Sequence, residues 1–312
     1  MVDLQVRCGG LVLANPVMPA SGTFAETMAQ VIDVDRLGAL VTKTITPDLR
    51  RGNPQPRVAE ATAAMLCSIG IPSKGPEHYV AQVMPFYAAR RPPLVASISA
   101  GSAQGFATLA ARLTAAGVDA IEANLSCPNL EQDGRAFAMV ARDTEDVVSC
   151  IRRATSLPLW VKLTPNVGDI ATIACAAESA GADALVVANA LLGMAIDVET
   201  FRPKLGNVMG GLTGPAVKPI ILRMVYQCAR AVALPIVGCG GIATAEDAVE
   251  YMLAGASAVQ VGTASFLRPT TMIDIIDALP AFLQRHGLAR AVDLVGALRV
   301  AEAPHPEWAM AG

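Results

Sequence analysis

The sequence predicts one α/β domain over residues 1–312, a (β/α)8 TIM barrel with a parallel eight-stranded sheet inside and helices outside. Two observations predict this fold class. Short apolar runs alternate with stretches of helical length, and one type of helix-to-strand junction recurs along the chain. No low-complexity segment or linker divides the sequence, so a single domain is expected.

The apolar runs have the length and the content of small and branched side chains that buried parallel strands require. They are Leu11–Ala20, Ala39–Ile45, Pro93–Ile98, Ala120–Leu125, Leu159–Leu163, Ala184–Ala188, Pro235–Val237 and Ala258–Val261. The helix-like segments between them are Ala103–Ala116, Glu145–Ala154, Ile170–Ala180, Lys218–Ala231, Ala245–Leu253 and Met272–Leu283.

The ends of these segments carry suitable capping residues. Thr244 and Thr144 each precede acidic residues, and we expect them to cap the helix that follows. Ala116-Gly-Val-Asp-Ala120, Ala180-Gly-Ala-Asp-Ala184 and Ala254-Gly-Ala-Ser-Ala258 each end a helix at Gly and open a strand. A doubly wound open sheet is the alternative, but no Gly-x-Gly-x-x-Gly follows the first strand.

The composition argues against several classes of protein. The net charge of −3 is too small to indicate a nucleic acid or an anionic membrane as partner. The 7 cysteines form no C-x-x-C pair, so neither a disulfide framework nor a zinc site is expected. The N-terminus lacks a signal-peptide pattern, and the most apolar stretch, Ala184–Ile196, is too short to span a bilayer. We therefore expect a cytoplasmic protein.

Polar residues and glycines follow the predicted strands at their carboxyl ends, where barrels of this class place their active sites. These positions are Ala20, Ser21, Gly22, Lys43, Thr44, Ser97, Asn124, Cys127, Asn129, Lys162, Asn189, Cys239, Gly240, Gly241, Gly262 and Thr263. The three histidines fall elsewhere, and no carboxylate pair ends a strand. The pattern therefore argues against a metal site and against glycoside hydrolysis.

Glycines after the last two strands indicate a phosphate-bearing ligand. Gly240 and Gly241 follow the seventh strand, and Gly262-Thr263 follows the eighth. Backbone N–H groups in such loops bind phosphate in many barrels, although tight turns alone would also explain the glycines. Lys43 and Lys162 end two further strands and are suited to neutralise an anion, or to form a Schiff base in a lyase or isomerase. Cys127 begins a loop rich in turn residues and is a candidate reactive thiol.

The motifs now resemble one family. Asn15-Pro-Val-Met-Pro-Ala-Ser-Gly22, Arg51-Gly-Asn-Pro-Gln-Pro-Arg57, Asn124-Leu-Ser-Cys-Pro-Asn129, Val161-Lys-Leu-Thr-Pro-Asn166, Asn189-Ala-Leu-Leu-Gly-Met194 and Gly210-Gly-Leu-Thr-Gly-Pro-Ala-Val-Lys-Pro219 are similar to those of class 1 dihydroorotate dehydrogenases, and most similar to class 1B catalytic subunits. The resemblance extends to about Leu283.

The resemblance implies an FMN-dependent oxidation of dihydroorotate to orotate in pyrimidine biosynthesis. It implies FMN contacts for Ser21, Lys43, Thr44, Asn124, Lys162, Ala188, Gly214, Gly240, Gly241, Gly262 and Thr263, to which the strand-end positions Ala20, Gly22 and Ser97 are added. It implies substrate contacts for Lys43, Cys67, Ser68, Ile69, Gly70, Ile71, Asn124, Asn129, Asn189 and Ala190.

The resemblance also implies the chemistry. Cys127 matches the general base that removes the C5 proton while hydride passes from C6 to flavin N5. Lys162 would stabilise negative charge near flavin N1, and Lys43 would pair with the substrate carboxylate. A class 1B enzyme further implies a separate iron–sulfur, FAD-containing subunit, in a homodimer or heterotetramer.

Three positions depart from the family pattern. Cys67 stands where Asn is usual, Ala190 where Ser or Thr is usual, and Ser97 where Asn is usual. Because hydrogen bonds to a substrate are lost with such residues, an alternative is a flavin enzyme acting on a different dihydropyrimidine-like ring. A flavin-binding protein without catalysis is a further alternative, against which Cys127 argues.

Overall fold

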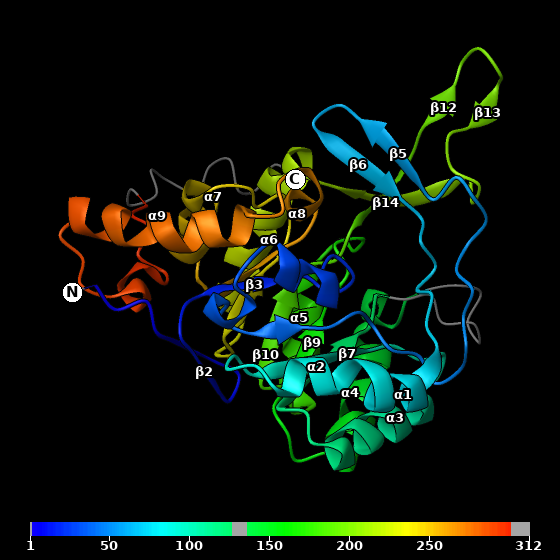
Figure 1. Cartoon of the computed structure of the whole chain (residues 1–312), viewed down its shortest axis with the longest axis horizontal. Coiled ribbons are helices and arrows are strands. Elements are labelled where there is room, and N and C mark those ends of the chain that lie inside the picture. Colours follow the sequence, from blue (N-terminus) through cyan, green and yellow to red (C-terminus); the bar gives the residue numbers. More distant parts are fainter. Residues whose placement is uncertain (1, 127–135, 301–312) are drawn as a thin grey trace, which may run out of the picture.

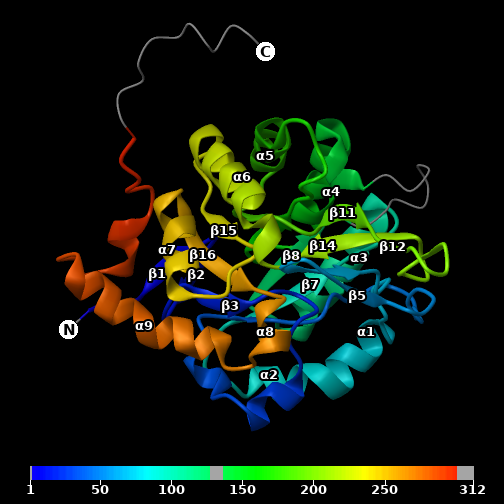
Figure 2. The same ribbon diagram turned by 90° about the horizontal axis from the view of Figure 1, so that it is seen from above.

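Eight parallel strands form one sheet that curves into a nearly closed barrel in this computed structural model, which describes residues 2–126 and 136–300 (Figures 1 and 2). Around the barrel the strand order is β3-β16-β15-β10-β9-β8-β7-β4. The bounds are β3 Val17–Pro19, β4 Leu40–Val41, β7 Leu94–Ile98, β8 Ala120–Asn124, β9 Leu159–Lys162, β10 Ala184–Val187, β15 Ile236–Gly238 and β16 Ala256–Val261. Beside β4 and β3 the Gly38 amide donates to Val17 O at 2.8 Å, which joins the two ends of the sheet. The predicted fold class is confirmed.

Helices cover the outside of the barrel, as Figure 2 shows from above. They are α1 Gly75–His78, α2 Met84–Ala88, α3 Ala103–Ala116, α4 Ala141–Ala154, α5 Ile170–Ser179, α6 Lys218–Ala231, α7 Ala245–Leu253, α8 Ala264–Leu267 and α9 Thr271–Arg285. Thr244 caps α7 as predicted, because its side chain accepts from the Asp247 amide and Asp247 accepts in return from the Thr244 amide.

Two predicted elements are corrected by the structure. The run Leu11–Ala20 is not one strand, because Asn15 and Pro16 interrupt it and the Asn15 side chain accepts from the Val17 amide. Its first part, β2 (Leu11–Leu13), instead pairs with β1 (Val6–Cys8) in an antiparallel hairpin. Thr144 does not cap α4, which begins at Ala141; its buried hydroxyl donates to Val140 O at 3.0 Å, inside the helix.

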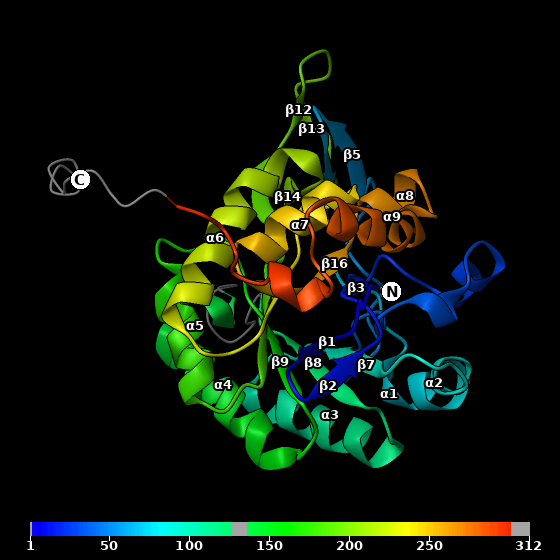
Figure 3. The ribbon, with the colours of Figure 1, turned by 90° about the vertical axis from the view of Figure 1, so that its left-hand side faces the viewer.

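The hairpin β1–β2 covers the end of the barrel where the strands begin (Figure 3). The indole of Trp160, fully buried on β9, donates to Gly9 O at 3.1 Å. A Cβ atom on Gly9 would lie 2.5 Å from Trp160 Nε1, so only glycine fits between the hairpin and this ring. The residues of the barrel strands are buried almost throughout, so side chains fill the barrel interior. Because the hairpin covers one end, a ligand would bind at the opposite end, where the strands finish.

At that opposite end lies a second sheet, which the sequence analysis did not predict (Figure 1). It is antiparallel in the order β11-β14-β6-β5, with β5 Val58–Ala61, β6 Ala64–Cys67, β11 Leu191–Met194 and β14 Met209–Thr213. The short hairpin β12 (Ile196–Asp197) and β13 (Arg202–Pro203) extends from it. Two insertions far apart in sequence, one after β4 and one after β10, therefore meet above the barrel mouth.

Candidate active site

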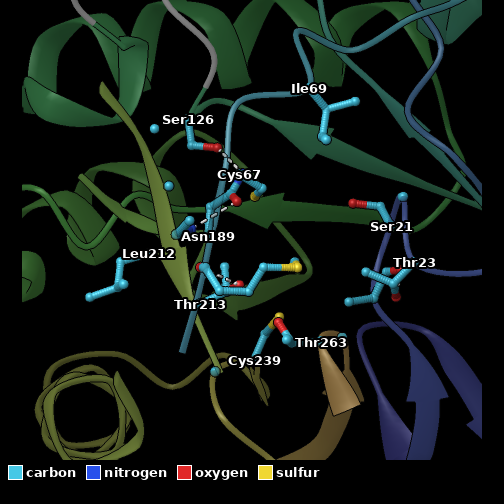
Figure 4. A pocket seen from close by; sticks show the side chains of 18 of the residues that line it. Ser21, Thr23, Cys67, Ile69, Ser126, Asn189, Leu212, Thr213, Cys239 and Thr263 are labelled. Carbon is cyan, nitrogen blue, oxygen red and sulfur yellow. Dashed lines mark hydrogen bonds between the residues drawn. The ribbon is translucent and has the colours of Figure 1, made fainter. Parts of the chain in front are cut away.

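A cavity of about 950 Å³ lies between the carboxyl ends of the barrel strands and the four-stranded sheet (Figure 4). That volume is within the range of pockets that hold cofactors and drug-sized ligands. Ser21 and Thr23, after β3, lie across the cavity from Ser126 and Asn189 (Figure 4). Cys67 of β6 and Leu212 of β14 supply part of the wall formed by the second sheet.

The structure brings most of the predicted site residues to this one cavity. It is lined by Ala20, Ser21, Gly22, Lys43, Thr44, Cys67, Ser68, Ile69, Gly70, Ile71, Asn124, Lys162, Ala188, Asn189, Ala190, Gly214, Gly240, Gly241, Gly262 and Thr263. Ser97 does not line it: the side chain is fully buried on β7, and its hydroxyl lies 3.0 Å from the Thr44 hydroxyl. Ser97 is therefore placed to orient Thr44, which does line the cavity. Cys127 and Asn129 lie outside the described residues.

Four main-chain amides at the ends of β15 and β16 have no acceptor within the described part of the chain. They belong to Gly240, Gly241, Gly262 and Thr263, which all line the cavity. A Cβ atom on Gly262 would make only ordinary contacts, 3.6 Å from Ala20 Cβ, so protein packing does not account for that glycine. Unpaired N–H groups at a strand-to-helix turn are suited to bind a phosphate.

Lys162 reaches the cavity from the barrel interior and is 3% exposed. Its ammonium donates to Gln260 Oε1 at 2.9 Å and lies 3.7 Å from Cys239 Sγ. Burial alone would lower the pKa of Lys162, but attraction to Cys239 and Glu122 more than offsets this and holds the pKa above its usual value. The site thus has a fixed positive charge beside the loops with free amides.

A network of amides and hydroxyls lies on the β8–β10 side of the cavity. Asn189 Nδ2 donates to Asn124 Oδ1 at 3.2 Å and also to Ser126 Oγ (Figure 4). The Asn189 oxygen accepts from the Ala190 amide at 2.8 Å. Because Asn124 Oδ1 accepts in this network and its NH₂ group has no acceptor among the described residues, that group can donate to a ligand.

The segment after β6 offers a second group of free amides. The N–H groups of Ile69, Gly70 and Ile71 have no acceptor in the described ranges, and all three residues line the cavity. Gly70 and Ile71 both have positive φ, 77° and 45°, a conformation that turns successive amides toward one point. The Lys43 side chain extends past Gly22, with Cδ 3.6 Å from the position of a Gly22 Cβ. This half of the cavity is therefore suited to a carboxylate.

Sequence reasoning missed the residues that support this segment. Asn53 Nδ2 donates to Ser68 Oγ at 2.7 Å, and Asn207 Nδ2 donates to the same oxygen at 3.2 Å. Both asparagines line the cavity, as does Asn166, whose side chain bonds Ala190 O and the Leu192 amide. Asn53 lies in the Arg-Gly-Asn-Pro motif, which was the only signal for it. Burial raises the pKa of the Cys67 thiol beside Ser68, so this thiol is neutral at neutral pH.

Comparison with known proteins places the chain in a family. The sequence model of the family described as dihydroorotate dehydrogenase matches residues 3–283. The chain belongs to the dihydroorotate dehydrogenase family. The protein of Pelobacter propionicus named "Dihydroorotate dehydrogenase B (NAD(+)), catalytic subunit" is 46% identical over 299 residues, which cover 95% of this chain and 98% of that protein.

Two further proteins carry the same name. That of Bacteroides thetaiotaomicron is 45% identical over 303 residues, covering 96% of this chain and all of the relative. That of Trichlorobacter lovleyi is 47% identical over 298 residues, which cover 95% of this chain and 98% of the relative. The resemblance seen in the motifs is confirmed at the level of the family.

In the described ranges, no helix is long and apolar enough to cross a membrane, and no group of three or more His, Cys, Asp or Glu is arranged to hold a metal ion.

Proposed function

We propose that this protein is an FMN-dependent dihydroorotate dehydrogenase that oxidises dihydroorotate to orotate in pyrimidine biosynthesis. The observation that carries the proposal is the pairing of two sets of free amides in one cavity. One set, at Gly240, Gly241, Gly262 and Thr263, fits a phosphate, and the other, at Ile69–Ile71, fits a carboxylate. FMN carries a phosphate and dihydroorotate carries a carboxylate. The curated relatives named above support the same assignment.

The cavity residues fit FMN in character as well as in place. The ends of β15 and β16 would hold the phosphate, and Lys162 would lie near the part of the flavin ring that becomes negative on reduction. Thr44, fixed by Ser97, and the Asn124 amide would bind polar edges of the ring. When bound, FMN would supply the acceptor for a hydride.

The protein's own residues would then orient the substrate and move one proton. Lys43 and the amides of Ile69–Ile71 would bind the carboxylate, and Asn124 and Asn189 would bind the ring amide groups. Cys127, three residues after Asn124 in the sequence, is proposed as the base that takes the C5 proton as hydride leaves C6. Loss of the C5 proton and of the C6 hydride together would convert dihydroorotate to orotate.

The relatives' name, catalytic subunit, indicates that those proteins work with another subunit. We extend this to the present chain and propose a cytoplasmic protein whose partner is an iron–sulfur, FAD-containing subunit that passes electrons to NAD⁺. The assembly would be a homodimer of this chain alone or a heterotetramer that includes the partner. The alternative ring substrate, suggested by Cys67 and Ala190, is not favoured by these relatives.

The test is an identification of cofactor and substrate. The cofactor released from purified protein by denaturation should have the mass of FMN, at about one per chain. With an artificial electron acceptor, dihydroorotate should be turned over, whereas dihydrouracil, which lacks the carboxylate, should be turned over at least 100-fold more slowly, as about 3 kcal/mol of charge-assisted contacts would give. Equal rates with the two rings would contradict the assignment of the carboxylate site.

A further inference from the structure

A chain of three polar side chains crosses the barrel interior beneath the cavity. Lys162 on β9 donates to Gln260 Oε1 on β16 at 2.9 Å, and Gln260 Nε2 donates to Glu122 Oε2 on β8 at 2.6 Å. Lys162 is 3%, Gln260 1% and Glu122 0% exposed. Glu122 pairs with Trp160 in the sheet, whereas Asn124 pairs with Lys162, so Glu122 lies one layer further from the mouth.

The hydrogen-bonding capacities of these side chains fix the direction of the chain. An ammonium can only donate, so Gln260 presents its oxygen to Lys162 and its NH₂ group to Glu122. A Glu122 oxygen therefore accepts from the amide. The other oxygen, Oε1, is buried with no partner among the described residues. A buried carboxylate without an ion pair or several hydrogen bonds is costly, so an ionised Glu122 requires a compensating positive charge nearby.

Lys162 is the positive group on the other side of the Gln260 amide from Glu122. A second titratable group, the Cys239 thiol, also lies close to the Lys162 ammonium. Cys239, at the end of β15, has its Sγ 3.7 Å from Lys162 Nζ. Burial raises the pKa of the Cys239 thiol, and Lys162 offsets this only in part. The thiol therefore keeps its proton at neutral pH, where its attraction for Lys162 is not developed, and Glu122 is the acidic side chain left to act on Lys162 through Gln260.

We propose that Glu122 is a positioning residue that keeps Lys162 in its ammonium form through Gln260. The consequence for catalysis rests on the proposed function: a charged Lys162 stabilises the negative charge of reduced FMN, whereas a neutral amine does not. Glu122 itself does not line the cavity, so it would act on the cofactor only through Lys162.

The first test is a titration of Lys162 in the protein as isolated, whether or not it carries a flavin. Lysine labelled with ¹³C at Cε reports ammonium or amine by its chemical shift, and a Lys162→Met variant assigns the signal. In Glu122→Gln and in Gln260→Met, Lys162 should hold its proton with an affinity at least about tenfold weaker than in the wild type, a full pKa unit. The double variant should shift no further than either single variant, because each breaks the same connection.

A control variant shows whether a shift in the Lys162 titration is specific to the loss of Glu122. Glu77→Gln removes a surface carboxylate paired with Arg112 and should leave the Lys162 titration unchanged. An unchanged titration in folded Glu122→Gln, or additive shifts in the double variant, would overturn the proposal. Because this titration needs no flavin, it tests the role of Glu122 even if the proposed cofactor is wrong.

The second readout is the reduction potential of the bound flavin as a function of pH. Below the pH at which Lys162 deprotonates in Glu122→Gln, the variant's potential should equal or exceed that of the wild type. Above that pH it should fall below it, by about 30 mV for each tenfold loss of reduced-state stabilisation in a two-electron couple. Parallel curves that never cross would contradict the proposal, since a purely structural role does not change the order of the potentials with pH.

Discussion

The hydroxyl of Tyr251 donates a 2.6 Å hydrogen bond to the carbonyl oxygen of Gly240. The Tyr251 ring also lies against Gly238, where a Cβ atom would come within 2.4 Å of it. Through these contacts a residue of α7 holds the loop after β15 in the conformation that leaves the Gly240 and Gly241 amides free. A buried side chain on an outer helix thus shapes the proposed phosphate site.

Tyr251→Phe should therefore weaken FMN binding without removing any direct contact to the ligand. One neutral hydrogen bond contributes about 1 kcal/mol, so we expect roughly a five- to tenfold increase in the dissociation constant. Fluorescence of FMN released on dilution measures this. Tyr226→Phe, on the neighbouring helix α6 where the ring lies beside Arg230, is the control and should bind as the wild type does.

Lys43→Met should separate substrate binding from cofactor binding. Because the methionine keeps most of the length of the side chain and loses the charge, FMN content should stay near that of the wild type. The value of kcat/KM for dihydroorotate should fall about 10- to 100-fold, as expected for a hydrogen bond to a charged group. Loss of flavin together with activity would mean that Lys43 serves the cofactor instead.

Cys67→Asn should improve turnover of dihydroorotate. The asparagine would supply an amide donor and acceptor at the cavity wall, where the thiol offers only weak hydrogen bonds. We expect a two- to tenfold decrease in KM, about 0.5–1.5 kcal/mol. Cys67→Ala, which adds no amide, should not reproduce the gain; an equal gain in both variants would attribute it to size alone.

Asp247→Asn should reduce stability in a pH-dependent way. Burial alone would raise the pKa of Asp247, but hydrogen bonds from Lys218 and from the Ala243 and Thr244 amides hold it below its usual value. A depressed pKa stabilises the fold above the unfolded carboxyl pKa of about 3.9, and this contribution is lost as the pH falls through the folded value. We expect a loss of about 1 kcal/mol at pH 7, typical of a cap.

Urea denaturation of Asp247→Asn and wild type at about pH 7 and below about pH 4 checks this dependence. The difference in free energy of unfolding should shrink toward zero at the lower pH. A difference that stays constant would show that packing, and not the charge of Asp247, is responsible. Glu250→Gln, which removes the second and more exposed partner of Lys218, should change stability by less than Asp247→Asn does.

The barrel could be predicted because most residues of its strands are apolar and several of its helices begin or end at recognisable residues. Thr244 fits the capping pattern and does cap α7, whereas Thr144 fits it equally well and does not cap α4. Local sequence did not distinguish the two, since the start of α4 depends on residues before Thr144 that pack against the barrel. The prediction of one strand over Leu11–Ala20 ignored Asn15-Pro16, although proline in a strand is a signal for a break.

The four-stranded sheet could not be predicted from local patterns. Its strands are short, and β14 begins with Met209-Gly-Gly. β6 pairs with β14 although four of the barrel strands, β7–β10, lie between them in the sequence. Such pairing depends on the barrel already bringing the two insertions together. Asn53 and Asn207 both donate to Ser68, which follows β6 of this sheet, and they were missed for the same reason. Glu122 and Gln260 did leave a signal, because each is a polar residue inside an otherwise apolar strand.

If the proposed function holds, dihydroorotate reduces FMN bound in this cavity. An anaerobic titration of the purified protein with dihydroorotate, followed by visible absorption, tests it most directly. We predict a yellow protein whose flavin absorption is bleached promptly, with one equivalent of orotate formed for each flavin reduced. A flavin that stays oxidised in the presence of excess dihydroorotate, while dithionite still reduces it, would contradict the account.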